Sequence, residues 1–215
     1  MDQKTKSAVS RTKILDAAVK EFSHIRYEKA SINQICRDGG ISKGRLYYYY
    51  ESKEQLYYAA AQRCFSRLGD HVCAFTPQPE LPMEENILRF FSVWQDFWRS
   101  NPQTAYFMGR VRLSPPDSLR ESIIALFVSL RERVLVVKLQ EIFRIYFPGD
   151  ETRQRLFAAI SYVAISYIAG YIGASQVDKL EKQPDFFDKQ MQLFKTLVHI
   201  FLHGCMNVEV PPLDF

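Results

Sequence analysis

The sequence predicts an all-α fold, with an N-terminal helix-turn-helix domain followed by a larger helical domain. Three observations support this expectation. Apolar residues recur at helical spacing, and no strand-like alternation of useful length is present. Glycine, proline and serine occur where helices begin and end. The first 60 residues hold 11 Lys/Arg and 7 Asp/Glu, whereas the other 155 hold 17 of each, so the net charge of +4 resides in the N-terminal part. Positive charge placed there suits attraction to phosphate.

Local signals define the N-terminal helices in order. The first is expected over about residues 9–24, from a helical stripe of Ile14, Leu15, Ala18 and Phe22. Ser31 and Ser52 each precede a glutamine by three residues, which is capping-box spacing and places helix starts at 32 and 53. Gly39-Gly40 ends the second helix, because glycine adopts the left-handed conformation at low cost. Ser42 then caps a third helix.

Prolines divide the remainder into further helices. The fourth helix is expected from Lys53 to about Phe75, and the segment Thr76 to Pro82 with its three prolines follows it. Further helices are expected at about 83–100, 103–113, 117–147, 151–176 and 185–205. We place a helix-turn-helix domain at residues 1–52 and a helical ligand-binding and dimerisation domain at residues 53–215.

One uncharged segment, Leu156 to Val177, is long enough to cross a bilayer. Its serines, glutamine and three tyrosines are unusual on a lipid-facing helix, so a buried helix is favoured and no membrane partner is expected. The first 13 residues are polar and basic, unlike a secretory signal. Without CxxC spacing, the four cysteines are expected as free thiols in a reducing cytoplasm, at Cys36, Cys64, Cys73 and Cys205.

The third predicted helix carries the clearest functional signal. It holds Lys43, Arg45 and four consecutive tyrosines at 47–50. Two short helices joined by a glycine turn, the second rich in cations and phenols, are typical of a helix that enters the DNA major groove. Cations there bind phosphates or guanine edges, and tyrosines offer hydroxyls to phosphates. Leu46 and Tyr50 share one face, which we expect in the core; ordinary core aromatics are the alternative for the whole run.

These residues resemble the TetR family of bacterial transcriptional regulators over about residues 11–60. The resemblance rests on RTKILDAAVKEF at 11–22, Tyr27-Glu28, Ser31, Gly40 to Gly44, Leu46-Tyr47-x-Tyr49 and Ser52-Lys53-Glu54. It implies that three helices bind a double-stranded DNA operator, that a fourth leads to an effector-binding core, and that the last two helices form a homodimer. The DNA contacts that it implies are Ser31, Lys43, Gly44, Arg45, Tyr47, Tyr48, Tyr49 and Lys53.

The chain departs from the family pattern at three positions. Arg26 stands where the family usually has glycine, and Ala30 stands where it usually has threonine. Ser31 alone is therefore expected to cap the second helix and to meet a phosphate. Tyr50 replaces a usual phenylalanine and adds a hydroxyl that needs a partner.

Two late segments have patterns typical of an interface. Apolar residues step by 4 and 3 through one segment, and small residues, including Ala159 and Val163, repeat that spacing through the other. Packing inside one domain is the alternative, but we favour a four-helix bundle between two copies of the chain. The predicted dimer interface consists of Ser166, Gly170, Gly173, Phe187, Met191, Phe194, Val198 and Phe201.

Aromatic residues crowd the helices expected at 83–100 and 103–113. Ligand sites are mostly apolar with few polar groups, so this stripe is a candidate site for an apolar or aromatic small-molecule effector. Plain core packing is the alternative. The predicted effector residues are Phe91, Trp94, Trp98, Phe107, Met108 and Arg112.

Other functional classes have weaker support. His199 and His203 have metal-ligand spacing, with Cys205 near, but lack a further partner close in sequence, so no metal or cofactor is expected. A redox sensor that uses a disulfide between Cys64 and Cys73 is disfavoured, because the two cysteines are too far apart on one predicted helix to bridge directly. No nucleophile elbow, phosphate loop or carboxylate pair indicates an enzyme. We therefore expect a homodimeric, cytoplasmic, DNA-binding repressor released by an effector; the alternative is a helical ligand- or partner-binding protein whose basic N-terminus does not read DNA.

Overall fold

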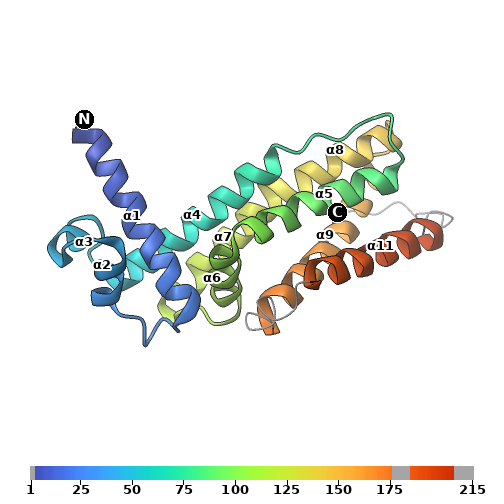
Figure 1. Cartoon of the computed structure of the whole chain (residues 1–215). Coiled ribbons are helices and arrows are strands. Elements are labelled where there is room, and N and C mark those ends of the chain that lie inside the picture. Colours follow the sequence, from blue (N-terminus) through green and yellow to red (C-terminus); the bar gives the residue numbers. More distant parts are fainter. Residues whose placement is uncertain (1–2, 176–184, 206–215) are drawn as a thin grey trace. The chain divides into compact units, whose positions relative to one another are not determined.

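The computed structural model describes residues 3–175 and 185–205, and these residues form helices without any strand (Figure 1). The side chains of 3–6, 164–175, 186, 187, 190 and 201–205 lie outside that description. The predicted all-α class is confirmed. The helices are α1 (Gln3–His24), α2 (Ile32–Gly39), α3 (Lys43–Tyr49), α4 (Lys53–Cys73), α5 (Met83–Ser100), α6 (Pro102–Leu113), η1 (Asp117–Leu119), α7 (Arg120–Leu130), η2 (Arg131–Leu135), α8 (Val136–Tyr146), α9 (Glu151–Ser175) and α11 (Phe186–Cys205).

The helix starts predicted at 32 and 53 are confirmed, and two other expectations differ from the structure. Helix α1 begins at Gln3 rather than near residue 9, because its first turns are polar and the apolar periodicity begins only after them. The single helix expected over 117–147 is interrupted by η2, which is a π-helical turn. Such a turn inserts extra backbone between α7 and α8. No proline or glycine in the sequence of η2 indicates its position.

The chain divides into two compact units, which we describe separately. The first comprises residues 1–67 and 101–127, and the second comprises 68–100 and 128–215. Helix α4 contributes to both units, since its first 15 residues lie in one and the remainder in the other. The domain boundary expected after residue 52 stays a prediction.

An aromatic cluster forms the centre of the first unit. The rings of Phe22 and Phe107 stack with centroids 5.8 Å apart, and Tyr57 lies edge-on to both at 4.9 and 5.1 Å. Tyr27 completes the cluster at 5.2 Å from Tyr57. Phe22 and Phe107 are fully buried. Helix α6 therefore covers the buried face of α1, and the N-terminal helices share one core with a segment beyond residue 100.

The second unit is a bundle in which α5 packs on α8 and α11, and α9 packs on α8 and α11 (Figure 1). Stacked rings join α5 to α11, with Phe91 and Phe194 centroids 3.8 Å apart. Phe143 of α8 packs against Phe157 of α9 at 5.6 Å. Packed aromatic rings thus join α5 to α11 and α8 to α9.

The proline-rich segment 76–82 is held in place by the buried side chain of Asn86. Its Oδ1 accepts from Gln78 N at 2.8 Å, and its Nδ2 donates to Gln78 O at 2.7 Å. The same amide contacts the hydroxyl of Tyr146, which donates to Leu81 O at 2.6 Å. A short loop that lacks regular structure is therefore fixed to both α5 and α8.

Helix α9 does not have the complete burial expected for the uncharged segment. None of the described helices is long and apolar enough to cross a membrane. Ala158 and Ser161 are buried, whereas Ile160 is 37% and Val163 64% exposed in the single chain. Apolar side chains thus remain uncovered on the described part of α9.

Replacing Asn86 by alanine is expected to lower the free energy of unfolding by about 1–3 kcal/mol, because the buried amide loses its hydrogen bonds to the main chain of Gln78 and to the Tyr146 hydroxyl. Urea denaturation of wild type and variant measures the change. Gln78→Ala is the matched control, since only the main chain of Gln78 takes part in these bonds. Equal stability of Asn86→Ala and wild type would contradict the role assigned to this amide.

Candidate nucleic-acid interface

The turn between α2 and α3 has the geometry predicted from its glycines. Gly40 has φ 60° and ψ 39°, which lies in the left-handed region. Its N–H bonds Arg37 O at 3.2 Å, and the N–H of Ile41 bonds Cys36 O at 3.0 Å. An added Cβ at Gly40 meets no described atom within 4 Å. The backbone angle, and not a lack of space, therefore requires glycine here.

Helix α3 is anchored by its start and by one buried face. The Oγ of Ser42 accepts from Arg45 N at 3.2 Å, as expected for its cap. Leu46 is fully buried and Tyr50 is only 8% exposed, so the predicted core face is confirmed. Burial raises the pKa of Tyr50. A helix of only seven residues is thus fixed by its cap and by the burial of Leu46 within it and of Tyr50 at its end.

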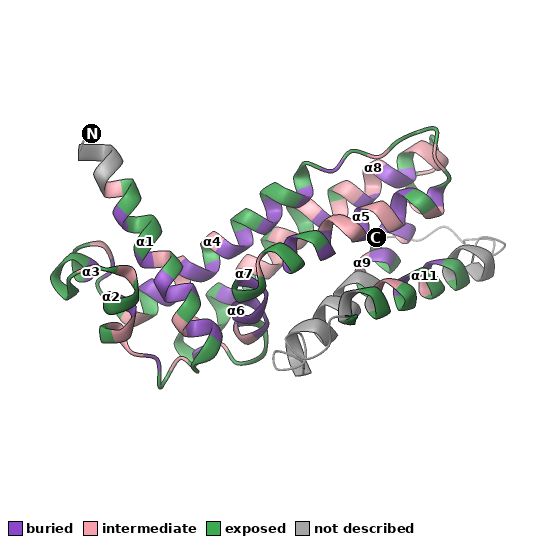
Figure 2. Cartoon of the chain, in the orientation of Figure 1, coloured by how far each residue is buried: buried purple, intermediate pink, exposed green. Residues whose placement is uncertain are grey.

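The other face of α3 is exposed and carries the predicted cations and tyrosines (Figure 2). Tyr47 is 41% exposed and Tyr48 is 82% exposed. Lys43, Gly44 and Arg45 are exposed as well. A Cβ added at Gly44 meets no described atom within 4 Å. Burial inside the chain therefore does not account for the side chains on this face.

Tyr49 differs from its neighbours because it lies against α1. Its hydroxyl donates to the Oγ of Ser7 at 3.1 Å, and the guanidinium of Arg11 lies 5.4 Å from its ring centroid. The hydrogen bond with Ser7 and the charge of Arg45 lower the pKa of Tyr49. Sequence reasoning missed Ser7, because it placed the start of the first helix after that residue. These contacts fix the end of α3 to α1.

The two predicted capping boxes close differently. At the start of α4, Ser52 Oγ accepts from Gln55 N at 3.1 Å, and the Gln55 side chain accepts from Glu51 N. At the start of α2, Ser31 Oγ accepts from Gln34 N at 3.4 Å, but Glu21 of α1 accepts from Ser31 N at 2.8 Å. The Gln34 side chain instead donates to Asp38 at 2.7 Å. The second helix is thus capped partly from α1, which the sequence pattern did not indicate.

An ion pair adds a further link between α1 and α2. Lys20 Nζ lies 3.0 Å from Asp38 Oδ2, and this lysine holds the pKa of Asp38 below its usual value. A lowered carboxyl pKa means that the pair stabilises the fold above the unfolded pKa, and that this contribution is lost as the pH falls through the folded value. The link is therefore intact at neutral pH.

Lys53 has partners inside the chain. Its Nζ donates to Ala30 O at 2.9 Å and to Glu28 O at 3.3 Å, and it lies 4.6 Å from the ring centroid of Tyr27. The cation in the first turn of α4 is disfavoured by the helix dipole. These carbonyls and the ring supply a reason within the chain for the position of Lys53. The family resemblance had implied only a DNA contact for this residue.

The predicted effector residues do not form one described group. Phe91, Trp94 and Trp98 lie together on α5 in the second unit and are buried. The other three belong to the first unit: buried Phe107 lies in the aromatic cluster, Met108 is buried, and Arg112 is exposed. For Phe107, packing against Phe22 and Tyr57 is therefore the observed role.

The predicted dimer seam is described only in part. Phe194 and Val198 are buried within the single chain, and Met191 is half-buried. Phe194 stacks on Phe91 of the same chain. The side chains of Ser166, Gly170, Gly173, Phe187 and Phe201 lie outside the described part of the molecule.

The three described cysteines lie on α2 and α4. Cys36, Cys64 and Cys73 are free thiols, and burial raises the pKa of Cys64 to about 11. Such a pKa keeps the Cys64 thiol protonated near neutral pH and poorly reactive. Across the described residues, no group of three histidine, cysteine or acidic side chains is arranged to hold a metal. The side chains of His203 and Cys205 lie outside that part of the chain.

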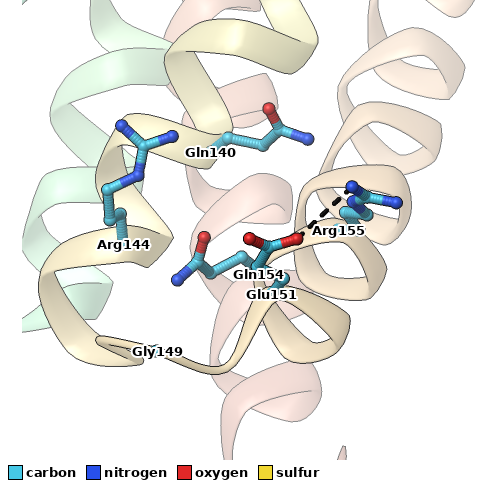
Figure 3. A pocket seen from close by; sticks show the side chains of 6 residues that line it. All are labelled: Gln140, Arg144, Gly149, Glu151, Gln154 and Arg155. Atoms are coloured by element: carbon cyan, nitrogen blue, oxygen red, sulfur yellow. Dashed lines mark hydrogen bonds and ion pairs between the residues drawn. The ribbon is translucent and has the colours of Figure 1, made fainter. Parts of the chain in front are cut away.

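A polar hollow of about 370 Å³ lies where α8 turns into α9 (Figure 3). It is lined by Gln140, Arg144, Gly149, Glu151, Gln154 and Arg155. Glu151 pairs with Arg155 at 3.4 Å, and Gln154 donates to Phe147 O at 2.7 Å. None of the six predicted effector residues lines this hollow. Its polar groups are already partly paired, so it remains a surface feature without an assigned ligand.

Comparisons with known proteins agree with the helix-turn-helix geometry. Residues 14–66 match the family described as bacterial regulatory proteins, tetR family. The biofilm operon icaADBC HTH-type negative transcriptional regulator IcaR of Staphylococcus epidermidis is 34% identical over 60 residues, which cover 28% of this chain and 32% of the relative. The match thus spans about a third of that relative's length. A relative of the same name from Staphylococcus aureus strain Newman is 32% identical over 60 residues.

Solved structures share the fold over nearly the whole chain. A TetR-like transcriptional regulator from Rhodococcus sp. RHA1 is similar with a TM-score of 0.62 and 23% identity, covering 92% of this chain and 97% of that one. The regulator FadR from Bacillus subtilis, in complex with stearoyl-CoA, has a TM-score of 0.63 and 16% identity, covering 90% and 98%. The matched family consists of regulatory proteins and not of enzymes.

Lys53→Met is expected to lower the free energy of unfolding by about 1–3 kcal/mol, because charged hydrogen bonds to two carbonyls are lost. Lys43→Met is the matched control, since Lys43 is exposed and its loss is expected to leave stability within about 0.5 kcal/mol of wild type. Thermal or urea unfolding compares the two. Equal stability of the two variants would mean that Lys53 contributes little to the fold.

Proposed function

We propose that the chain is a transcriptional repressor that binds operator DNA through α3. The match of residues 14–66 to the TetR family of bacterial regulatory proteins supports this proposal. The observation that supports this most strongly is the exposed face of α3. Lys43, Arg45, Tyr47 and Tyr48 are presented together on a helix whose opposite face is buried. Rigid presentation of cations and phenols suits a helix that enters the major groove.

The chemistry of this face divides into two kinds of contact. Lys43 and Arg45 are suited to phosphates or to guanine edges, and Tyr48 is suited to a phosphate or a thymine methyl. Gly44 is suited to close approach of the DNA backbone, because nothing in the described chain fills the space above it. Ser31, Tyr47 and Tyr49 are proposed as further contacts at the margin. Repression is supported by the printed name of the relative IcaR, a negative transcriptional regulator.

Lys53 takes a second role in this proposal. It fixes the carbonyls of Glu28 and Ala30 to the start of α4 and so positions the segment before Ser31. We propose that its effect on DNA binding acts mainly through this positioning. Lys53 is half-buried. A direct contact between its ammonium and a DNA phosphate would add to the positioning effect.

We propose a homodimer formed through the uncovered apolar faces of α9 and α11. On α11, Phe194 and Val198 face the core, while Leu193 is 43% and Ile200 61% exposed. A helix that is apolar on two faces needs a second partner. On α9, which packs on α11, Val163 is 64% exposed. A second copy would cover these faces, and Ser166, Gly170, Gly173, Phe187 and Phe201 remain proposed members of the interface.

We propose that an apolar small molecule releases the protein from DNA. The structurally similar FadR of Bacillus subtilis was solved with stearoyl-CoA, which supports an effector with a large apolar part. In this chain the buried aromatics Phe91, Trp94 and Trp98 of α5 are the proposed contacts. An effector lowers operator affinity only by its differential affinity for the state that does not fit DNA. Arg112, which lies in the other unit, is not needed for this proposal.

The DNA proposal is tested with an operator selected from a randomised duplex pool. Tyr48→Ala is expected to weaken binding by about 1–3 kcal/mol if the contact is direct. Gly44→Ala is expected to raise the free energy of unfolding by about 0.5–1 kcal/mol, because alanine is the better helix former. It is nevertheless expected to weaken operator binding, since a methyl group obstructs close approach. Fluorescence anisotropy at several salt concentrations measures both affinities.

Opposite signs for Gly44→Ala, with higher stability and lower affinity, separate a DNA-contact role from a structural one. If wild type selects no sequence, or if both variants bind as tightly as wild type, the assignment of α3 is wrong. The remaining explanation would then be a helical protein whose basic N-terminal part serves another partner.

The dimer proposal predicts that Ile200→Glu and Val163→Glu each weaken self-association at least about tenfold, because a charge would be buried without a partner. Sedimentation velocity across a concentration series measures this. Ile124→Glu is the matched control, because Ile124 is 54% exposed on α7 and belongs to neither α9 nor α11, so its replacement should leave the dimer intact. An unchanged dimer in both test variants would place the interface elsewhere.

A further inference from the structure

The indole N–H of Trp94 is buried, and no residue that the structure describes accepts a hydrogen bond from it. Trp94 is 5% exposed, and across the described part of the chain its Nε1 has no hydrogen-bond acceptor. Two arginine Nε atoms share this condition, at Arg63 and Arg110. Those arginines bond through their other nitrogens, to Thr12 O and Asp16 in one case and to His24 O in the other. Trp94 has a single polar atom, so its side chain has no such alternative.

An unpartnered buried donor is a feature that folding alone does not favour. Buried indole N–H groups usually find an acceptor, and leaving one unbonded costs free energy that a phenylalanine at the same place would avoid. The site therefore suits an acceptor supplied from outside the chain. A ligand or a trapped water could provide it, and the two are distinguishable.

The surroundings of Trp94 that the structure describes are aromatic. Phe91 and Trp98 lie three residues before it and four after it, on the same side of α5, and the two indole centroids are 6.4 Å apart. Phe91 is itself stacked on Phe194 of α11. Rings offer no strong acceptor to an N–H, so these neighbours suit the apolar body of a ligand and leave its polar atom to Trp94.

The cations of α5 are engaged elsewhere. Arg89 contacts the Oδ1 of Asn86 and lies over the ring of Phe75, and Arg99 pairs with Asp96 and Asp188. A buried carboxylate or phosphate without a cation would be strongly disfavoured. A neutral acceptor, such as the oxygen of a ketone, ester, lactone or amide, would not.

We infer that the effector carries a neutral carbonyl-type oxygen that accepts the hydrogen bond of Trp94 Nε1–H, with its apolar or aromatic body against Phe91 and Trp98. This inference rests on the proposed effector function and adds its chemical class. The acceptor group gives specificity, since an otherwise identical molecule without it leaves the indole unpartnered.

A matched pair of probes tests the inference. 2-Acetylnaphthalene and 2-ethylnaphthalene have similar shapes, but only the first has a carbonyl. The ketone is expected to bind the wild-type protein about tenfold more tightly, and to lower operator affinity at lower concentration. In Trp94→Phe the two probes should bind alike. Trp98→Phe is the comparison variant: it removes ring area that both probes contact, so it should weaken the binding of both alike and keep the preference for the ketone.

A second measurement leaves Trp94 unchanged. The chain has two tryptophans, so Trp98→Phe makes Trp94 the only one, and its indole ¹⁵N–¹H resonance can be assigned at once. Addition of the ketone is expected to shift this resonance downfield, whereas the hydrocarbon is not. This arm holds even if Trp94→Phe does not fold.

The outcomes separate the two levels of the proposal. If both probes bind and release DNA with equal affinity, the effector function stands and the role of Trp94 is wrong. A magnetisation transfer from Trp94 N–H to water that persists with the ketone bound would identify a trapped water only, and would also overturn the inference. If neither probe binds or releases DNA, the aromatic effector proposal itself fails, and the inference fails with it.

Discussion

The stacking of Phe22 on Phe107 is the contact on which the helix-turn-helix most depends. Phe22 belongs to α1 and Phe107 to α6, and Tyr57 of α4 lies edge-on to both rings. The buried face of α1 is therefore completed by a segment that follows α5 in the chain. Helices α2 and α3 are in turn tied to α1, through Glu21 and Lys20 on one side and through Ser7 on the other. The orientation of α3 is thus set by a core that the N-terminal helices alone do not supply.

The features available from sequence were those with a local cause. Ser31 and Ser52 located two helix starts, because a cap acts within its own first turn. The positions of Leu46 and Tyr50 on α3 followed from helical spacing. The partners of Lys53, Tyr49 and Phe107 did not, since each contact joins residues at least 23 positions apart. Long-range contacts depend on how helices pack, and neither periodicity nor capping specifies them.

The aromatic stripe illustrates a different limit. Its residues were grouped because they are close in sequence. In the structure its aromatic residues are buried, but they are divided between the two compact units. Phe107 completes one core, while Phe91 stacks in another. In the sequence, Trp94 stood out only as one member of that stripe. The absence of an acceptor for that N–H among the described residues is a structural observation that no pattern could supply.

The first compact unit is discontinuous, and this has a consequence for synthesis on the ribosome. Residues 1–67 leave the ribosome well before residues 101–127 that complete the same core. During that interval Phe22 and Tyr57 lack the ring of Phe107, so the helix-turn-helix emerges with part of its apolar surface uncovered. The nascent N-terminal helices therefore cannot reach their final packing until α5 has been translated and α6 has followed it. A vectorial order of assembly is built into the chain, with DNA-binding geometry completed after the helices that display it.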